Sequence, residues 1–122
     1  MTDAVVKLLP EAVDDLRGLD GSAKKVVLAG IKKLRTDPQL RGAPLGATSS
    51  GNLTGFRKLV VGDRSYRIVY RVHGDGTVAV VWVIGKRSDS EVYDEATARL
   101  GDYAGDSEKR QALQQLLDTA FG

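Results

Sequence analysis

The chain has 122 residues, of which 42% are hydrophobic and 28% are charged, and these proportions fit a single folded domain rather than a disordered segment. It contains no cysteine, which excludes disulfides, thiol catalysis and thiolate metal sites. No apolar run approaches the roughly 18 residues that a membrane-spanning helix needs, and the N-terminus lacks the apolar stretch of a signal peptide. We therefore expect a cytoplasmic protein without membrane contact.

The formal net charge of +2 is distributed unevenly along the chain. Residues 1–93 hold 15 Lys/Arg against 10 Asp/Glu, whereas residues 94–122 hold 3 against 6. A basic body with an acidic tail favours a surface that binds a polyanion.

The N-terminal third predicts one strand followed by two helices. Residues 4–9 (AVVKLL) are β-branched and apolar, as in a strand, and Pro10 suits the first turn of a helix. Ser22 is a favourable N-cap for a second helix, which ends before Pro38. The two helices together predict a helical hairpin that buries its apolar stripe on a sheet.

The middle of the chain predicts a loop and then the first strands of an antiparallel meander. Residues 39–52 contain glycines, a proline and a polar run, which is typical of a loop. Residues 53–61 have strand composition, and Gly55 within them favours a bulge. Residues 66–72 (YRIVYRV) alternate, so that Arg67 and Arg71 share one face of a half-buried strand.

A tight turn and a buried strand complete the meander. Residues 73–76 (HGDG) supply the small and polar residues of a hairpin turn. Residues 77–84 are apolar on both faces, which predicts a central strand covered on both sides.

The tail predicts two helices. Residues 93–100 can form a short helix that breaks at Gly101, and residues 106–120 carry an apolar stripe at helical spacing. This stripe fits either a helix that caps the core or an element that docks a partner.

These elements predict an α+β fold. A small antiparallel-rich sheet, made of the N-terminal strand and the three-strand meander, packs against the helical hairpin and is followed by C-terminal helices. We expect one domain at residues 1–100 and a helical extension of the same domain at residues 101–122.

The chemistry available to this chain is cationic and phenolic. A single histidine, His73, lies in a predicted turn, which leaves little for a Ser-His-Asp triad or a multi-histidine metal site to be built from, and no phosphate-binding glycine loop is present. Arginine, lysine and tyrosine suit a negatively charged substrate such as RNA. Attack by a ribose 2′-hydroxyl on the adjacent phosphate needs neither metal nor cofactor, and we expect none.

Four of these residues can converge on one patch: Arg67, Lys86, Arg87 and Tyr93. A lysine or tyrosine of lowered pKa could move a proton there. The cations also fit a simpler interpretation, in which they form only the solvated face of an antiparallel sheet.

An ordered set of motifs over about residues 4–100 resembles the RelE/ParE superfamily of type II toxins, and most closely its RelE group. The motifs are DPQLRGAPL, LTGFRKLVVGD, YRIVYRV, VWVIGKR and SEVYDEA. The resemblance implies a RelE-like fold and ribosome-dependent cleavage of mRNA in the A site, by 2′-hydroxyl attack that leaves a 2′,3′-cyclic phosphate.

The resemblance also implies roles for individual residues. Arg67 matches the arginine that binds the phosphate, Arg87 the arginine that stabilises the transition state or protonates the leaving group, and Tyr93 the tyrosine that stacks on an mRNA base. Arg57 and Lys58 stand where the RelE group has two alternating lysines. Because they are adjacent, they should face opposite sides, which leaves the identity of the general base open.

Further cations are expected to contact RNA, namely Lys86, Arg71, Lys32 and Lys33. The resemblance implies a cognate antitoxin, the ribosome and mRNA as partners. Two other functions remain open. A ParE-like toxin would inhibit DNA gyrase, and an inactive protein of the same fold would only bind its partners.

Overall fold

The structure is a computed structural model that describes residues 3–49, 51–86 and 88–121. Within these ranges it contains a five-stranded sheet, four α-helices and two 3₁₀ helices. In chain order they are β1 (Val5–Leu8), α1 (Pro10–Arg17), α2 (Gly21–Lys33), η1 (Pro38–Leu40), β2 (Ala43–Thr48), β3 (Gly51–Val61), β4 (Tyr66–His73), η2 (Gly74–Gly76), β5 (Val78–Lys86), α3 (Asp89–Gly105) and α4 (Ser107–Phe121).

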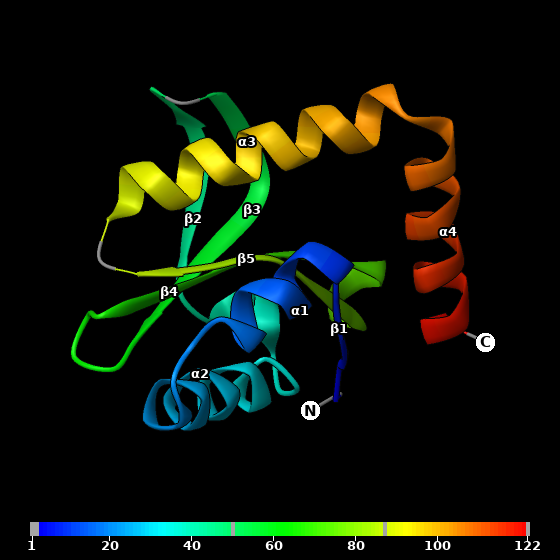
Figure 1. Ribbon diagram of the computed structural model, residues 1–122. Helices are drawn as coiled ribbons and strands as arrows, with labels where there is room; N and C mark the ends of the chain where they lie inside the picture. The colour runs from blue at the N-terminus through cyan, green and yellow to red at the C-terminus, as the bar shows by residue number, and fades with distance from the viewer. Residues whose placement is uncertain (1–2, 50, 87, 122) are drawn as a thin grey trace.

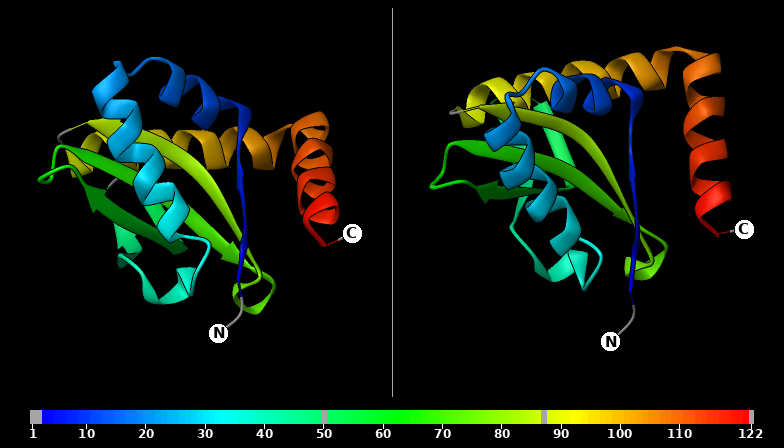
Figure 2. Two further views of the ribbon diagram at one scale, coloured as in Figure 1. Left: turned by 90° about the horizontal axis from the view of Figure 1, so that it is seen from below. Right: turned by 60° about the horizontal axis from the view of Figure 1, so that its bottom comes forward.

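The sheet lies between two layers of helices, with strand order β1-β5-β4-β3-β2. β1 runs parallel to β5, and the other neighbours are antiparallel. Helices α1 and α2 cover one face, α3 crosses the other, and α4 turns sharply away from the axis of α3 at its far end (Figures 1 and 2). The predicted α+β architecture is confirmed.

The core is built around β5, as its apolar sequence predicts. Seven consecutive residues of this strand, Val78–Ile84, are buried because helices cover both sides of the sheet. On the neighbouring strand Tyr70 is fully buried. Its hydroxyl lies within hydrogen-bond distance of two carbonyl oxygens, that of Pro38 at 2.8 Å and that of Arg41 at 2.7 Å, and donates to one of them. This bond satisfies a polar group that burial would otherwise penalise.

The predicted alternation of β4 is preserved across an irregularity in β5. The register moves from Val69 opposite Val83 to Tyr70 opposite Val81, so Trp82 is the extra residue of a bulge. Its indole packs edge-on against Phe56, with ring centroids 5.2 Å apart. The bulge therefore lets an additional aromatic side chain join the layer beneath α3.

The prediction of a loop at residues 39–52 is wrong. The segment forms η1 and β2, and β2 pairs antiparallel with β3 at the edge of the sheet. Its glycines and proline are tolerated there because an edge strand bonds on one side only. The predicted bulge is present, since Gly55 has φ +92° where the β2–β3 register shifts.

Two helix boundaries also differ from the prediction. Asp20, not Ser22, caps α2, because its carboxylate accepts from the Ala23 amide at 2.9 Å, and Ser22 instead donates to Asp20. Helix α3 does not break at Gly101. A glycine inside a helix costs only about 1 kcal/mol relative to alanine, and buried Tyr103 anchors the turn beyond it.

The last helix packs against the rest of the molecule. The partly buried side chains Leu113, Leu116 and Leu117 of α4 lie against the core, and Asp106 caps its first turn through the amides of Glu108 and Lys109. Of the two roles left open for this apolar stripe, core packing is the one that the described residues display. None of the described helices is long and apolar enough to cross a membrane.

Candidate functional site

The sheet places two cations side by side on the face that α3 covers. Arg67 on β4 and Lys58 on β3 point to the same side because of the register between these strands. The Asp89 carboxylate joins them, since Oδ1 accepts from Arg67 Nε at 2.6 Å and Oδ2 accepts from Lys58 Nζ at 3.0 Å. Arg67 also donates Nη1 to the carbonyl of Arg64 at 2.8 Å, which fixes its guanidinium.

The first turn of α3 supplies the acidic and aromatic members of the site. Asp89 is the first residue of the helix, and Tyr93 follows one turn later on the same side. The Lys58 Nζ lies 5.6 Å from the centroid of the Tyr93 ring, within the range of a cation–π contact. We refer to Lys58, Arg67, Asp89 and Tyr93 as the cation cluster.

A glycine allows α3 to lie this close to the sheet. Gly85 stands opposite Arg67 in the β4–β5 register, and a Cβ atom at Gly85 would collide with the Val92 side chain. The glycine that precedes the Lys-Arg pair in the sequence therefore sets the distance between α3 and the two cations.

The charges of the cluster are unequal in number and in exposure. The Arg67 and Lys58 side chains are 12% and 17% exposed, whereas Asp89 is 45% exposed. Hydrogen bonds from Arg67 and then from Lys58 hold the pKa of Asp89 below its usual value. Burial alone would lower the pKa of Lys58, but its contacts with Tyr93 and Asp89 outweigh burial and raise it. Lys58 is therefore an ammonium at neutral pH, and the expectation that a lysine of lowered pKa acts here is wrong for Lys58.

The cluster borders an open groove of about 810 Å³. Pairing with β2 stops at Lys58, so the groove follows the outer edge of β3 where that edge has no neighbouring strand. Its lining includes four cations and two carboxylates, namely Lys33, Lys58, Arg64, Arg67, Asp63 and Asp89. The balance of charge favours an anionic occupant.

Two arginines expected near the site lie away from the cation cluster. Arg57 donates Nε to the Arg41 carbonyl at 2.8 Å and Nη2 to the Gly42 carbonyl at 3.3 Å, so it braces the start of β2. This agrees with the expectation that Arg57 and Lys58 face opposite sides. Arg71 lies over the Phe56 ring, 5.1 Å from its centroid, farther along β4.

The remaining expected residues are divided between the groove and the outer surface. Lys33 lines the groove, and Lys32 beside it is exposed near the end of α2. Lys86 is exposed at the end of β5, and its charge contributes to the lowered pKa of Asp20, after the stronger hydrogen bonds from Ala23 and Ser22. Arg87, expected to be catalytic, lies outside the described residues.

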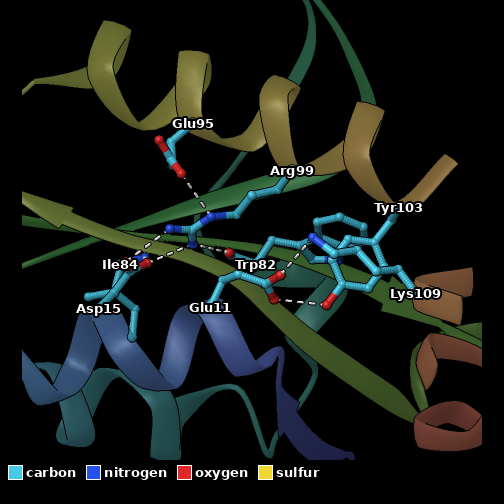
Figure 3. A network of polar contacts seen from close by, with 8 residues as sticks. All are labelled: Glu11, Asp15, Trp82, Ile84, Glu95, Arg99, Tyr103 and Lys109. Carbon is cyan, nitrogen blue, oxygen red and sulfur yellow. Dashed lines mark hydrogen bonds and ion pairs between the residues drawn. The ribbon is translucent and has the colours of Figure 1, made fainter. Parts of the chain in front are cut away.

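A second polar cluster holds α3 in place from the other side of β5. β1 pairs with β5 only as far as Val81, and beyond it side chains from two helices hydrogen-bond to the edge of β5 that has no strand partner. Asp15 of α1 accepts from the Ile84 amide at 3.0 Å, and Arg99 of α3 donates to the Trp82 carbonyl at 2.7 Å. Arg99 also donates to both oxygens of the Asp15 carboxylate, from Nη1 at 2.7 Å and from Nη2 at 3.0 Å (Figure 3).

Further contacts extend this cluster toward α4. The Arg99 Nε donates to Glu95 at 3.0 Å, Tyr103 donates its hydroxyl to Glu11 of α1 at 2.8 Å, and Lys109 of α4 lies 3.5 Å from Glu11 (Figure 3). Burial and the bond to Glu11 raise the pKa of Tyr103, so it remains a phenol. We refer to the residues drawn in Figure 3 as the helix clamp. Because α3 carries Asp89 and Tyr93, the clamp also positions the cation cluster.

The described residues offer no group of three or more His, Asp or Glu side chains that could hold a metal ion. His73 is at the opposite end of β4 from Arg67, and burial together with the nearby Arg71 lowers its pKa. It does not contribute to the cation cluster.

Sequence reasoning missed the acidic member of the site. The run Ser88-Asp-Ser-Glu91 is a capping-box pattern, and the Glu91 amide donates to Ser88 Oγ at 3.4 Å. Recognising this pattern would have moved the start of α3 from residue 93 to residue 89 and placed Asp89 at the edge of the site. Asp15 and Arg99 are 84 residues apart, and no local pattern links them.

Structures already solved share this fold. A mutant of the E. coli toxin RelE in the free state matches with a TM-score of 0.64 and 23% identity, covering 80% of this chain and 97% of that one. The toxin–antitoxin complex RelBE2 of Mycobacterium tuberculosis gives 0.59 and 24%, covering 70% and 99%. The chromosomal ParDE system of P. aeruginosa gives 0.55 and 16%, covering 72% and 100%.

The sequence itself places the chain among toxins. A family model described as the ParE toxin of the type II toxin-antitoxin system parDE matches residues 6–91. The chain therefore belongs to this family, within the RelE/ParE superfamily of type II toxins. Comparison with curated proteins gave no match.

Proposed function

We propose that this toxin is an endoribonuclease that cleaves mRNA in the ribosomal A site. The observation that carries the proposal is the cation cluster, in which two half-buried cations and an aromatic ring lie together beside an open groove. Cations fixed in a partly desolvated site stabilise the charge that a phosphate gains in its transition state.

Three members of the cluster have a role in this reaction. The Arg67 guanidinium binds the non-bridging oxygens of the scissile phosphate, and the Tyr93 ring stacks on a neighbouring base. The 2′-oxygen bonds to phosphorus, its proton passes to water, and the bond from phosphorus to the 5′-oxygen breaks. Lys58, protonated because its pKa is raised, donates a proton to the departing 5′-oxygen. Arg87 remains the proposed third cation.

Partner surfaces follow from the same proposal. Lys32, Lys33, Arg71 and Lys86 would contact ribosomal or messenger RNA phosphates, which position a protein without specifying sequence. A cognate antitoxin would neutralise the toxin. Its support is that solved structures of the same fold, such as RelBE2, are toxin–antitoxin complexes.

Primer extension on a translated mRNA with purified ribosomes tests the proposal. We expect cuts at A-site codons with the unaltered protein, and at least about a hundred-fold fewer with Arg67→Ala, the usual cost of losing a donor to transition-state charge. Arg17→Ala is the matched control, because Arg17 is exposed on α1 and its removal should leave cutting unchanged. Intact mRNA at every protein concentration would refute the nuclease.

A second function is favoured by two specific observations. The matching family model is that of ParE, and Asp89 neutralises part of the charge that a phosphate would need. A ParE-like toxin would inhibit gyrase, and its inhibition of DNA supercoiling should survive Arg67→Ala. Supercoiling assays on the same two proteins therefore separate the candidates, and an inactive binding protein would give neither activity.

A further inference from the structure

Asp89 occupies the position that an oxyanion would take between the two cations. Its two oxygens are separately bound, one by Arg67 Nε at 2.6 Å and the other by Lys58 Nζ at 3.0 Å. A phosphate presents oxygens at similar spacing, and arginine and lysine bind carboxylate and phosphate by the same charge-assisted hydrogen bonds.

The two sides of this contact differ in how firmly they are held. Arg67 is 12% exposed and keeps its hydrogen bond to the Arg64 carbonyl, while Lys58 is 17% exposed and rests against the Tyr93 ring. Asp89 is 45% exposed, and its carboxylate contacts only these two cations among the described residues. A rotation of the Asp89 side chain toward solvent would therefore leave the cations in place.

Charge gives a reason for an anion to enter. When Asp89 leaves, Lys58 and Arg67 lose their paired carboxylate, and the groove lining then holds four cations against the single carboxylate of Asp63. Unpaired buried charges are unfavourable, so the open site would bind an external anion strongly.

We propose that Lys58 and Arg67 form an oxyanion site that the Asp89 carboxylate fills in the free toxin, and that a phosphate group enters by displacing it. Asp89 is then a built-in competitor, which offsets one of the two positive charges until a ligand supplies its own negative charge. The identification of that ligand as the mRNA phosphodiester rests on the proposed nuclease function, whereas the oxyanion site does not.

Phosphate binding to three proteins tests the inference directly. Inorganic phosphate is titrated into the unaltered chain, Asp89→Asn and Asp94→Asn, and the dissociation constant is measured by NMR shifts of the arginine and lysine side chains. Asp94 is exposed on α3, so its variant carries the same change in net charge away from the cations. Asp89→Ser is a second uncharged variant, should asparagine disturb the start of the helix.

We expect phosphate to bind at least ten-fold more tightly to Asp89→Asn and Asp89→Ser, and equally to Asp94→Asn and the unaltered chain. Phosphate should also raise the melting temperature of Asp89→Asn more than that of the unaltered chain. If the Asp89 carboxylate only stabilises the fold, its removal would lower the melting temperature without improving phosphate binding, and that result would overturn the inference.

Ribosome assays on the same proteins separate this inference from the proposed function. Tighter phosphate binding by Asp89→Asn, with no mRNA cleavage by the unaltered chain, would support the oxyanion site and refute the nuclease. Cleavage by the unaltered chain, with phosphate affinity unchanged in both Asp89 variants, would support the nuclease and refute the displacement.

Discussion

The cation cluster and the helix clamp are both built from ion pairs around α3, but their charges are balanced in opposite ways. In the clamp, Arg99 lies between the carboxylates of Asp15 and Glu95. It also donates to the Trp82 carbonyl, which has no partner on a neighbouring strand. In the cation cluster, two cations share one carboxylate beside an open groove. The charged groups of Arg99 are fully paired within the clamp, whereas the cation cluster has one more cation than it has carboxylates.

The difference shows how one helix can be both anchored and functional. Arg99 and Asp15, 11% and 19% exposed, bond the free edge of β5 and secure the middle of α3. Such an edge would otherwise present unpaired backbone groups. The anchored helix then holds Asp89 and Tyr93 against the sheet at its N-terminal end, beside the open groove.

The largest expected effect comes from breaking the clamp. Arg99→Leu leaves the Asp15 carboxylate half-buried without its partner and exposes the Trp82 carbonyl, so we expect a loss of about 3 kcal/mol in the free energy of unfolding. Urea denaturation measures it. Arg17→Ala removes an exposed pair with Asp14 and should cost less than about 0.5 kcal/mol. Equal losses in the two variants would show that the contacts of Arg99 stabilise the fold no more than an exposed ion pair does.

A smaller effect is expected at the other end of the clamp. Tyr103→Phe keeps the ring that packs against Trp82 but removes the hydrogen bond to the Glu11 carboxylate. Hydrogen bonds to charged groups contribute about 1.5 kcal/mol or more, so we expect a loss of that size in the same denaturation assay. An unchanged free energy of unfolding would show that Lys109 alone satisfies Glu11.

The cation cluster should matter much less for stability. Asp89, the partner of Arg67, is 45% exposed, so Arg67→Ala should lower the free energy of unfolding by less than about 1 kcal/mol. A loss as large as that of Arg99→Leu, measured side by side, would mean that the cluster is a second structural clamp.

Acid should reveal the smallest effect, through Asp89. Arg67 and Lys58 hold the pKa of Asp89 in the folded chain below its usual value of 3.8. Its contribution to stability is therefore fully present above the unfolded pKa and is lost as the pH falls through the lower folded pKa. Between about pH 4 and pH 2 the unaltered chain should lose more stability than Asp89→Asn, as urea midpoints across this range would measure. If the urea midpoints of the two proteins fall in parallel over this range, Asp89 does not stabilise the fold through its ion pairs with Arg67 and Lys58.

The parts of the fold that local patterns determine were predicted. The alternation of residues 66–72 and the apolar run of residues 77–84 specified β4 and β5, and Pro10 marked the start of α1. Strand β2 was missed because its glycines and proline resemble a loop, and only its pairing with β3 makes it a strand.

The candidate site was predicted in part for a similar reason. Alternation and the spacing to Tyr93 brought Arg67 and Tyr93 into consideration, and the resemblance to RelE toxins added Lys58. The structure places these three together. The separation of Arg57 from them follows from its adjacency to Lys58. The contacts of Arg99 depend on where β1 ends along β5, which no local sequence pattern encodes.

The most direct test of the account compares Arg67→Ala with Arg99→Leu in the ribosome assay, at a temperature where denaturation curves show both variants to be folded. Cleavage in the A site per folded molecule should fall at least about a hundred-fold in Arg67→Ala and much less in Arg99→Leu, which weakens the anchoring of α3 but keeps every residue of the cation cluster. Equal cleavage by Arg67→Ala and the unaltered chain would contradict the account, because the cation cluster would then have no part in the reaction.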